Sequence, residues 1–159
     1  MSKKNYLLAM YQRLERWPLG KRLFARAFCR RAPYFGSIRP QVEALEANRC
    51  VVRIRKRRRV ENHIGTVHVI AICNGLEMAM GAAAEAGIPP TLRWIPKGMT
   101  VDYTARADSD IRAIAEIDAQ AWQPGEVPVR VRAERNDGVV VVEGRILLHV
   151  SEKPARSDS

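Results

Sequence analysis

A glutamate in the middle of a long apolar run is the residue of this sequence that most needs a chemical explanation. Residues 69–87 are almost all apolar or small, and the polar exceptions are Asn74, Glu77 and Glu85. A helix of this length is about 30 Å long, and a helix that is apolar on all sides belongs in a core. Because an unpaired charge is costly to bury, Glu77 is either a general base or nucleophile, or a structural carboxylate that caps a loop or pairs with an arginine of a neighbouring subunit.

The polar residues directly before this run could assist such a carboxylate. Asn62, Gly65, Thr66 and His68 precede a helix that we expect to begin at Val69. The first N–H groups of a helix are unpaired and lie at the positive end of its dipole, so the amide near Val69 could polarise a carbonyl. Asn62 would orient that carbonyl or a water. His68 would either support the loop or donate a hydrogen bond.

Metal and cofactor chemistry are not indicated by the remaining candidate ligands. His63, His68 and Glu77 do not follow a recognised ligand spacing, so we expect no metal and no cofactor. The cysteines are odd in number and have no metal-like spacing, which predicts reduced thiols and a cytoplasmic location. They are Cys29, Cys50 and Cys73.

The basic charge of the chain is concentrated at its N-terminus. Residues 1–39 hold ten Lys or Arg and one acid, Glu15, which gives +9 of the total net charge of +10. Apolar periodicity predicts one helix over 3–16 and a second from Pro18 to about Arg31. These helices could pack on the rest of the domain, cover a ligand tunnel, or contact an anionic membrane peripherally through residues 1–31.

The remaining segments predict an antiparallel sheet. Strands are expected over 42–46, 50–55, 91–96, 99–107, 111–117, 127–135 and 139–150. Alternation over 129–134 predicts a sheet with one solvated face, and Asn136-Asp137-Gly138 predicts a hairpin turn. The predicted class is α+β, with a curved antiparallel sheet around the long helix and a helical hairpin before it. The tail, 151–159, is expected to be disordered.

This arrangement resembles a known family. The topology over residues 40–150 resembles the hotdog fold, and the motif before the helix resembles that of hotdog acyl-CoA thioesterases. In that family an Asn or Gln, a Gly and a His-Gly-Gly sequence lead into the central helix, and a catalytic Asp or Glu follows nine positions after the His. Asn62, Gly65, Thr66 and His68 stand at the corresponding places, and Glu77 is nine positions after His68.

The resemblance implies an activity and an assembly. It implies hydrolysis of acyl-CoA or another thioester, with Glu77, Asn62 and His68 as catalytic residues and with Gly65, Thr66 and Val69 binding the substrate. It also implies a homodimer or a dimer of dimers, because the family builds each site from two subunits. It divides the chain into a basic helical extension over 1–39, a hotdog domain over 40–150 and the tail.

One departure from the family motif supports a different function. Val69-Ile70 replaces the family's Gly-Gly, which adds bulk where the substrate carbonyl would lie. This favours the alternative that the protein binds acyl-CoA or acyl chains without turning them over. A dehydratase is disfavoured, because hotdog dehydratases space their His and carboxylate differently.

A run of six basic residues in seven, 53–59, has two interpretations. It could protect a strand edge against aggregation, or Arg57 and Arg58 could bind the phosphates of coenzyme A. Binding of nucleic acid is disfavoured, because no aromatic residues that could stack on bases interleave with the run.

Overall fold

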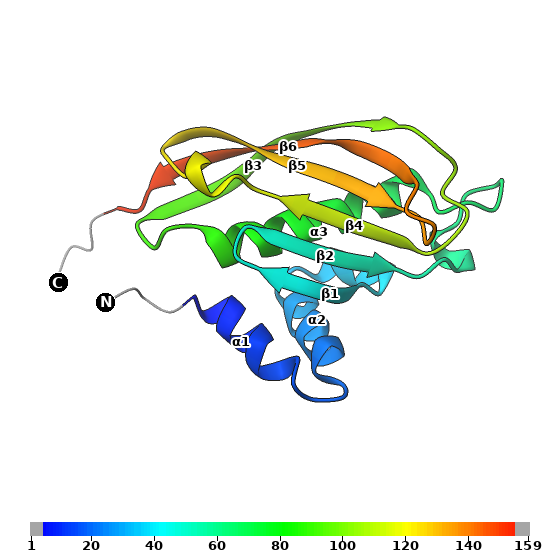
Figure 1. Cartoon of the computed structure of the whole chain (residues 1–159), viewed down its shortest axis with the longest axis horizontal. Helices are drawn as coiled ribbons and strands as arrows, with labels where there is room; N and C mark the ends of the chain where they lie inside the picture. Colours follow the sequence, from blue (N-terminus) through cyan, green and yellow to red (C-terminus); the bar gives the residue numbers. More distant parts are fainter. Residues whose placement is uncertain (1–4, 155–159) are drawn as a thin grey trace.

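The long apolar helix forms as predicted and organises the molecule. In the computed structural model, which describes residues 5–154, it is α3, Val69–Gly87, and a six-stranded sheet curves around it (Figure 1). The strands are β1 (Gln41–Glu46), β2 (Arg49–Ile54), β3 (Leu92–Tyr103), β4 (Ile111–Glu116), β5 (Gly125–Glu134) and β6 (Val140–Glu152). The expected α+β class is confirmed.

The sheet is antiparallel throughout, in the order β1-β2-β4-β5-β6-β3. Its strands alternate as the sequence predicted: along β5, Val129 and Val131 are buried while Arg130 is exposed. The buried side packs on α3, so the core lies between the helix and the concave face of the sheet. The predicted hairpin turn also forms, with Gly138 at a φ of 83° between β5 and β6.

Several strand boundaries differ by one or two residues from the sequence-based expectation, and β3 differs most. The segments expected over 91–96 and 99–107 form one strand, β3, which ends at Tyr103. A register shift between Pro96 and Gly98 absorbs the interruption, and the missing N–H of Pro96 is tolerated because β3 is an edge strand. β6 runs to Glu152, so the first two residues of the expected tail pair with β3, and residues 155–159 lie outside the described residues.

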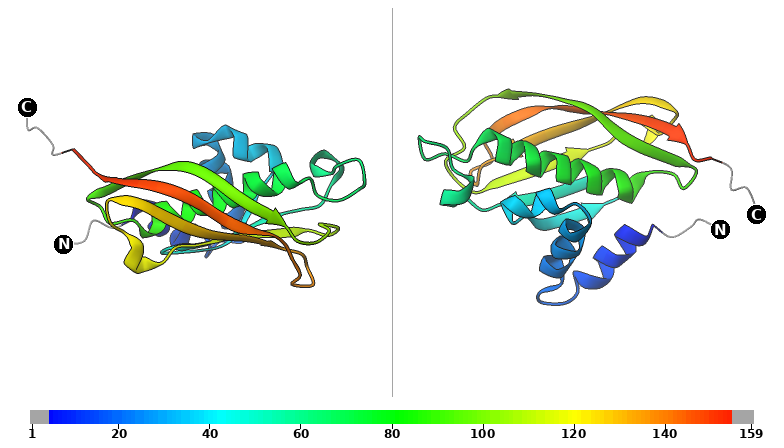
Figure 2. Two further views of the ribbon diagram at one scale, coloured as in Figure 1. Left: turned by 90° about the horizontal axis from the view of Figure 1, so that it is seen from above. Right: turned by 180° about the vertical axis from the view of Figure 1, so that it is seen from behind.

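Both N-terminal helices form and pack beside α3 at the β1 edge of the sheet (Figure 2). They are α1, Tyr6–Leu14, and α2, Gly20–Arg31. Between them Tyr11 and Phe24 are buried in an edge-to-face contact with their ring centroids 5.1 Å apart. The Tyr11 hydroxyl donates a hydrogen bond to the Glu43 carbonyl of β1, and burial raises the pKa of Tyr11 to about 12.

The connection from α2 to the sheet is ordered. A 3-10 helix, η1 (Pro33–Ile38), lies between α2 and β1. The Asn74 amide of α3 donates to the Tyr34 carbonyl at 3.3 Å and to the Ser37 hydroxyl at 3.2 Å. Asn74, a polar exception of the apolar helix, therefore holds η1 against the core.

Coverage of α3 is incomplete, contrary to the expectation that its whole circumference would be buried. One stripe of the helix, carrying Ile70, Glu77 and Glu85, is exposed in the single chain. By length and composition α3 could cross a membrane, but 67% of its most apolar window is buried inside the protein. It is the core helix of the domain, with one open side.

Candidate active site

The predicted loop residues come together at the N-terminus of α3. The Asn62 side-chain oxygen accepts hydrogen bonds from the Ile64 and Thr66 N–H groups, and its amide donates to the Thr66 hydroxyl at 2.8 Å. Gly65 completes the turn with a φ of 74°, in the left-handed region that favours glycine. Within one chain, the polar groups of Asn62 therefore stabilise the loop itself.

The end of this loop caps α3. His68 is the N-cap residue, and its Nδ1 accepts a hydrogen bond from the Ile70 N–H at 3.1 Å. Because Nδ1 accepts this bond, a neutral His68 ring carries its proton on Nε2. The side chain is exposed, so the Nε2–H group can donate to a second molecule. The Val69 N–H has no acceptor among residues 5–154, so one amide remains free at the positive end of the helix.

Glu77 lies in an apolar groove between α3 and the N-terminal helices. The groove has a volume of about 680 Å³. Its apolar lining comes from α1, α2, η1, α3 and the start of β3, and includes Leu7, Met10, Phe28, Phe35, Met80 and Trp94. We had expected Glu77 to be buried, and this was wrong: its side chain is exposed in the single chain, because the stripe of α3 that carries it has no covering element.

Glu77 and the loop do not meet within one chain. Nine residues of helix separate His68 from Glu77, which corresponds to about 13.5 Å along the axis. Glu77 has no hydrogen-bond or ion-pair partner within residues 5–154, whereas Glu85, two turns further on, accepts from the Trp94 indole at 2.9 Å. Both the loop and Glu77 border the open stripe of α3, so a second molecule against that stripe could bring another copy of the loop near Glu77.

Some residues of the basic run 53–59 form ion pairs, and others have no acidic partner among the described residues. Arg53 pairs with Asp110 at 2.6 Å and Lys56 pairs with Glu61 at 3.0 Å. Arg57 and Arg58 have no acidic partner among the described residues, and Arg57 donates to the Ser37 carbonyl. Partial burial, with Arg39 and Arg59 nearby, lowers the pKa of Arg57. Arg57 and Arg58 thus form a positive cluster close to the Asn62–His68 loop, and this cluster could hold an anion.

The walls of the groove were missed by reasoning from the sequence. Phe28, Phe35 and Trp94 come from segments far apart in the chain, and none carries a motif. Apolar faces were visible on both N-terminal helices, but a face of that kind indicates packing without indicating a ligand.

Cys50 is fully buried, which raises the pKa of its thiol to about 12 and excludes it from nucleophilic chemistry.

Comparison with solved structures finds chains of the same fold. The crystal structure of a genomics target, APC5556, is 42% identical, superposes with a TM-score of 0.79, and covers 94% of this chain and 98% of its own. The unaligned 6% of this chain is smaller than the helical pair, so the similarity extends into α1 and α2. No match is found among curated proteins.

More distant structures share the fold. A protein of unknown function from Pseudomonas aeruginosa, PA5026, described as a probable thioesterase, is 22% identical with a TM-score of 0.71, covering 81% of this chain and 93% of its own. A thioesterase family protein from Silicibacter pomeroyi is 16% identical with a TM-score of 0.68, covering 81% and 96%. These neighbours confirm the hotdog fold. A family model described as a domain of unknown function, DUF4442, matches residues 20–150, and the chain belongs to that family.

Proposed function

We propose that this protein hydrolyses an acyl-CoA or related thioester, with Glu77 as general base or nucleophile. The observation that carries the proposal is the position of Glu77: a carboxylate without an ion pair among the described residues, in a largely apolar groove that Arg31 and Glu85 also line and that is large enough for an organic ligand. Water activation needs a free carboxylate, and an acyl chain needs an apolar surface beside it. The groove offers both, and the fold is one that proteins described as thioesterases share.

The carbonyl would be polarised by the helix start of a second subunit. Because Glu77 and Val69 are about 12 Å apart along one helix, a single chain cannot place both at one carbonyl. A dimer, or a dimer of dimers, whose open α3 stripes face each other would place the Val69 N–H, Asn62 and His68 of one subunit near Glu77 of the other. The long β3 edge, with Ile95 and Tyr103 exposed, supports pairing along the same side.

Coenzyme A would be held at its phosphates by the free basic cluster. Arg57 and Arg58 are exposed or half-exposed, unpaired, and lie at the entrance to the Asn62–His68 loop. Replacing both by Ala should raise KM for CoA esters more than for pantetheine esters, which lack the nucleotide. High salt should reduce the difference, because exposed charge contacts are screened. Equal losses on the two substrate types would remove this role.

Glu77→Gln tests the catalytic role directly. The amide keeps the shape of the side chain but cannot accept the proton or attack, so thioester turnover should fall by roughly 10²–10⁴. Because Glu77 is exposed and unpaired in the chain, the melting temperature should stay unchanged. Free thiol release from a panel of short, long and aromatic acyl-CoA esters measures the rate. An active and stable Glu77→Gln protein would contradict the assignment.

Mixing two inactive variants tests the shared site. In a mixed dimer of Glu77→Gln and Asn62→Ala chains, one site carries both changes and the other carries neither. After random subunit exchange half of the dimers are mixed, so about one quarter of the wild-type activity should return. Activity that stays at the level of the separate variants would place Glu77 and Asn62 in one subunit's site.

One observation favours the alternative function, non-catalytic binding of acyl-CoA or acyl chains. The Ile70 N–H is occupied by His68 Nδ1, and the exposed Ile70 side chain adds bulk beside the remaining amide of Val69. In that case saturable binding of acyl-CoA, measured by calorimetry, would occur without thiol release from any ester of the panel.

A further inference from the structure

We propose that the corner between α1 and α2 docks this protein on an anionic lipid surface. The corner carries three large apolar side chains in solvent: Trp17, Leu19 and Leu23 are 69%, 59% and 53% exposed. With Met10, Leu14 and Pro18 they line one shallow hollow. Soluble proteins scatter single exposed apolar residues, but a contiguous group of this kind marks an interaction site. We call this group the apolar corner.

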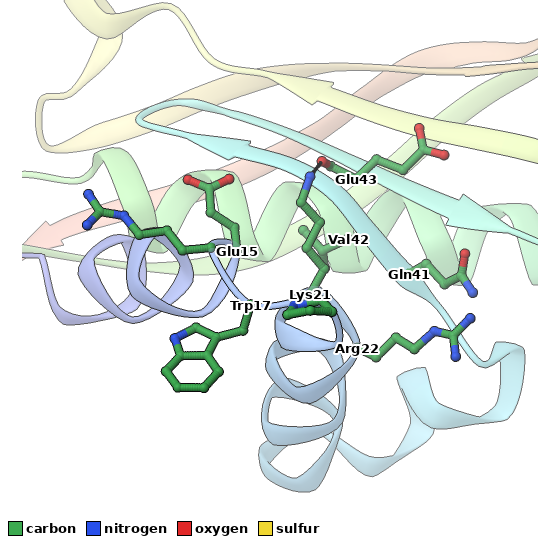
Figure 3. A pocket seen from close by; sticks show the side chains of 9 residues that line it. Glu15, Trp17, Lys21, Arg22, Gln41, Val42 and Glu43 are labelled. Atoms are coloured by element: carbon green, nitrogen blue, oxygen red, sulfur yellow. Dashed lines mark hydrogen bonds between the residues drawn. The ribbon is translucent and has the colours of Figure 1, made fainter.

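The apolar corner points away from the sheet. In Figure 3 the Trp17 ring projects away from the strands, whereas the carboxylate of Glu15 points toward them. Lys21 is also turned back to the sheet, where its ammonium donates to the Glu43 carbonyl. Glu15 and Lys21 share a second hollow with Trp17 and Pro18, but the polar ends of both side chains turn to the sheet, and the corner protrudes at the edge of the molecule (Figure 1).

Unpaired arginines extend from the apolar corner along α1 and α2. Over residues 5–31 there are seven basic side chains and one acid, a net charge of +6. None of the six arginines among them forms an ion pair with a described residue: Arg13, Arg16, Arg22, Arg26, Arg30 and Arg31. Arg13 lines the hollow itself, and Arg26 lies one turn of α2 beyond Leu23.

This combination of chemistry fits a lipid surface. Trp and Leu side chains enter the boundary between headgroups and acyl chains, while arginines keep their charged ends among anionic headgroups. Each basic residue close to an anionic leaflet contributes favourably, and the contribution falls off within a Debye length. A single-stranded nucleic acid would need aromatic side chains on which its bases stack. Two of the three exposed apolar side chains of the corner, Leu19 and Leu23, are aliphatic, which disfavours nucleic acid as the partner.

Docking at this corner would also connect the lipid surface with the Glu77 groove. Met10 lines both the hollow at the corner and the groove, so the two apolar surfaces are continuous along α1. An acyl chain taken from the lipid would therefore travel along one side of a single helix. The docking proposal stands without this step, because it depends on the exposure and charge of the corner alone.

Vesicle flotation of the full-length protein tests the proposal. We expect binding to vesicles of phosphatidylcholine with phosphatidylglycerol, weak binding to phosphatidylcholine alone, and a loss of binding at high salt. Trp17→Ser with Leu23→Ser should reduce partitioning about tenfold or more, because two inserted side chains are removed. Val139→Ser, which changes an exposed apolar residue at the β5–β6 turn, is the matched control and should bind normally.

A charge-matched pair of variants separates docking from net charge. Arg22→Glu with Arg26→Glu should reduce binding about tenfold or more. Arg130→Glu with Arg145→Glu changes the net charge equally, on β5 and β6, and should leave most of the binding. Equal losses in the two double variants, equal binding to both vesicle types, or competition by duplex DNA at the same corner residues would overturn the proposal.

Discussion

The arginines of the sheet and those of the helical pair have opposite surroundings. On β2, β4 and β5 four arginines meet carboxylates across the strands: Arg49, Arg53, Arg112 and Arg132. The register brings them together, since Arg49 lies directly opposite Glu116 and both Arg49 and Arg132 bind that carboxylate. On α1 and α2 the arginines have no such partner among residues 5–154.

This difference separates charges that serve the fold from charges available to a ligand. Paired charges on the sheet satisfy one another, and the cluster is close to neutral. Unpaired arginines on a helical surface repel each other slightly and gain nothing from the fold. They remain available to an anion outside the chain, whether a lipid headgroup at the α1–α2 corner or a phosphate at Arg57 and Arg58.

The largest effect is expected where the sheet is most closely packed. A Cβ added to Gly144 of β6 would lie 2.0 Å from the Thr100 carbonyl oxygen of β3. Because backbone atoms cannot give way cheaply, Gly144→Ala should cost about 3 kcal/mol and lower the melting temperature by about 6–12 °C. Gly98→Ala on β3, where a Cβ meets nothing within 4 Å, is the control and should melt within about 2 °C of the wild type.

A medium effect is expected from the paired charges of the sheet. Partial burial acts to raise the pKa of Asp110, but hydrogen bonds from the Lys56 N–H and from Arg53 outweigh it and hold that pKa below its usual value. Asp110→Asn should cost about 1–2 kcal/mol at pH 7, since its side chain is 20% exposed and partly screened.

The pH dependence of this loss follows from the direction of the shift. A carboxyl group whose pKa is lower in the folded state stabilises the fold at pH values above its unfolded pKa of about 3.9. This stabilisation is lost as the pH falls through the folded pKa. The difference in melting temperature between wild type and Asp110→Asn should therefore be full at pH 7 and shrink below about pH 4. A constant difference across this range would show that the ion pair is not its source.

The smallest effect is expected from the unpaired charges of the helical pair. Arg22→Glu with Arg26→Glu removes no ion pair seen among the described residues, so the free energy of unfolding should change by less than about 0.5 kcal/mol. Thermal melting in a buffer without lipid checks this. A large destabilisation would mean that these arginines serve the fold after all, and the contrast with the sheet would disappear.

Local patterns in the sequence determined most of the fold. The apolar run without proline determined α3 to the residue, and strict alternation determined the solvated face of β5. Asn-Asp-Gly determined the turn before β6, because glycine accepts the positive φ found at Gly138. Each of these features depends on neighbours a few positions away, which a sequence displays directly. The spacing from Asn62 to His68 likewise predicted a shared loop, and the residues do share one.

Tertiary structure alone decided which side of α3 stays open and what surrounds Glu77. The sequence makes α3 apolar on nearly all sides, so it could not reveal that Glu77 would be exposed on one stripe. The groove is built by α1, α2, η1, α3 and β3, whose meeting depends on contacts between residues far apart in the chain. Pairing of the arginines was decided in the same way: Arg53 meets Asp110, 57 residues away, across the sheet. The helical pair packs on β1, but the Glu43 carboxylate of that strand is bound by Arg53 and Arg112, and the arginines of α1 and α2 have no acidic partner among the described residues.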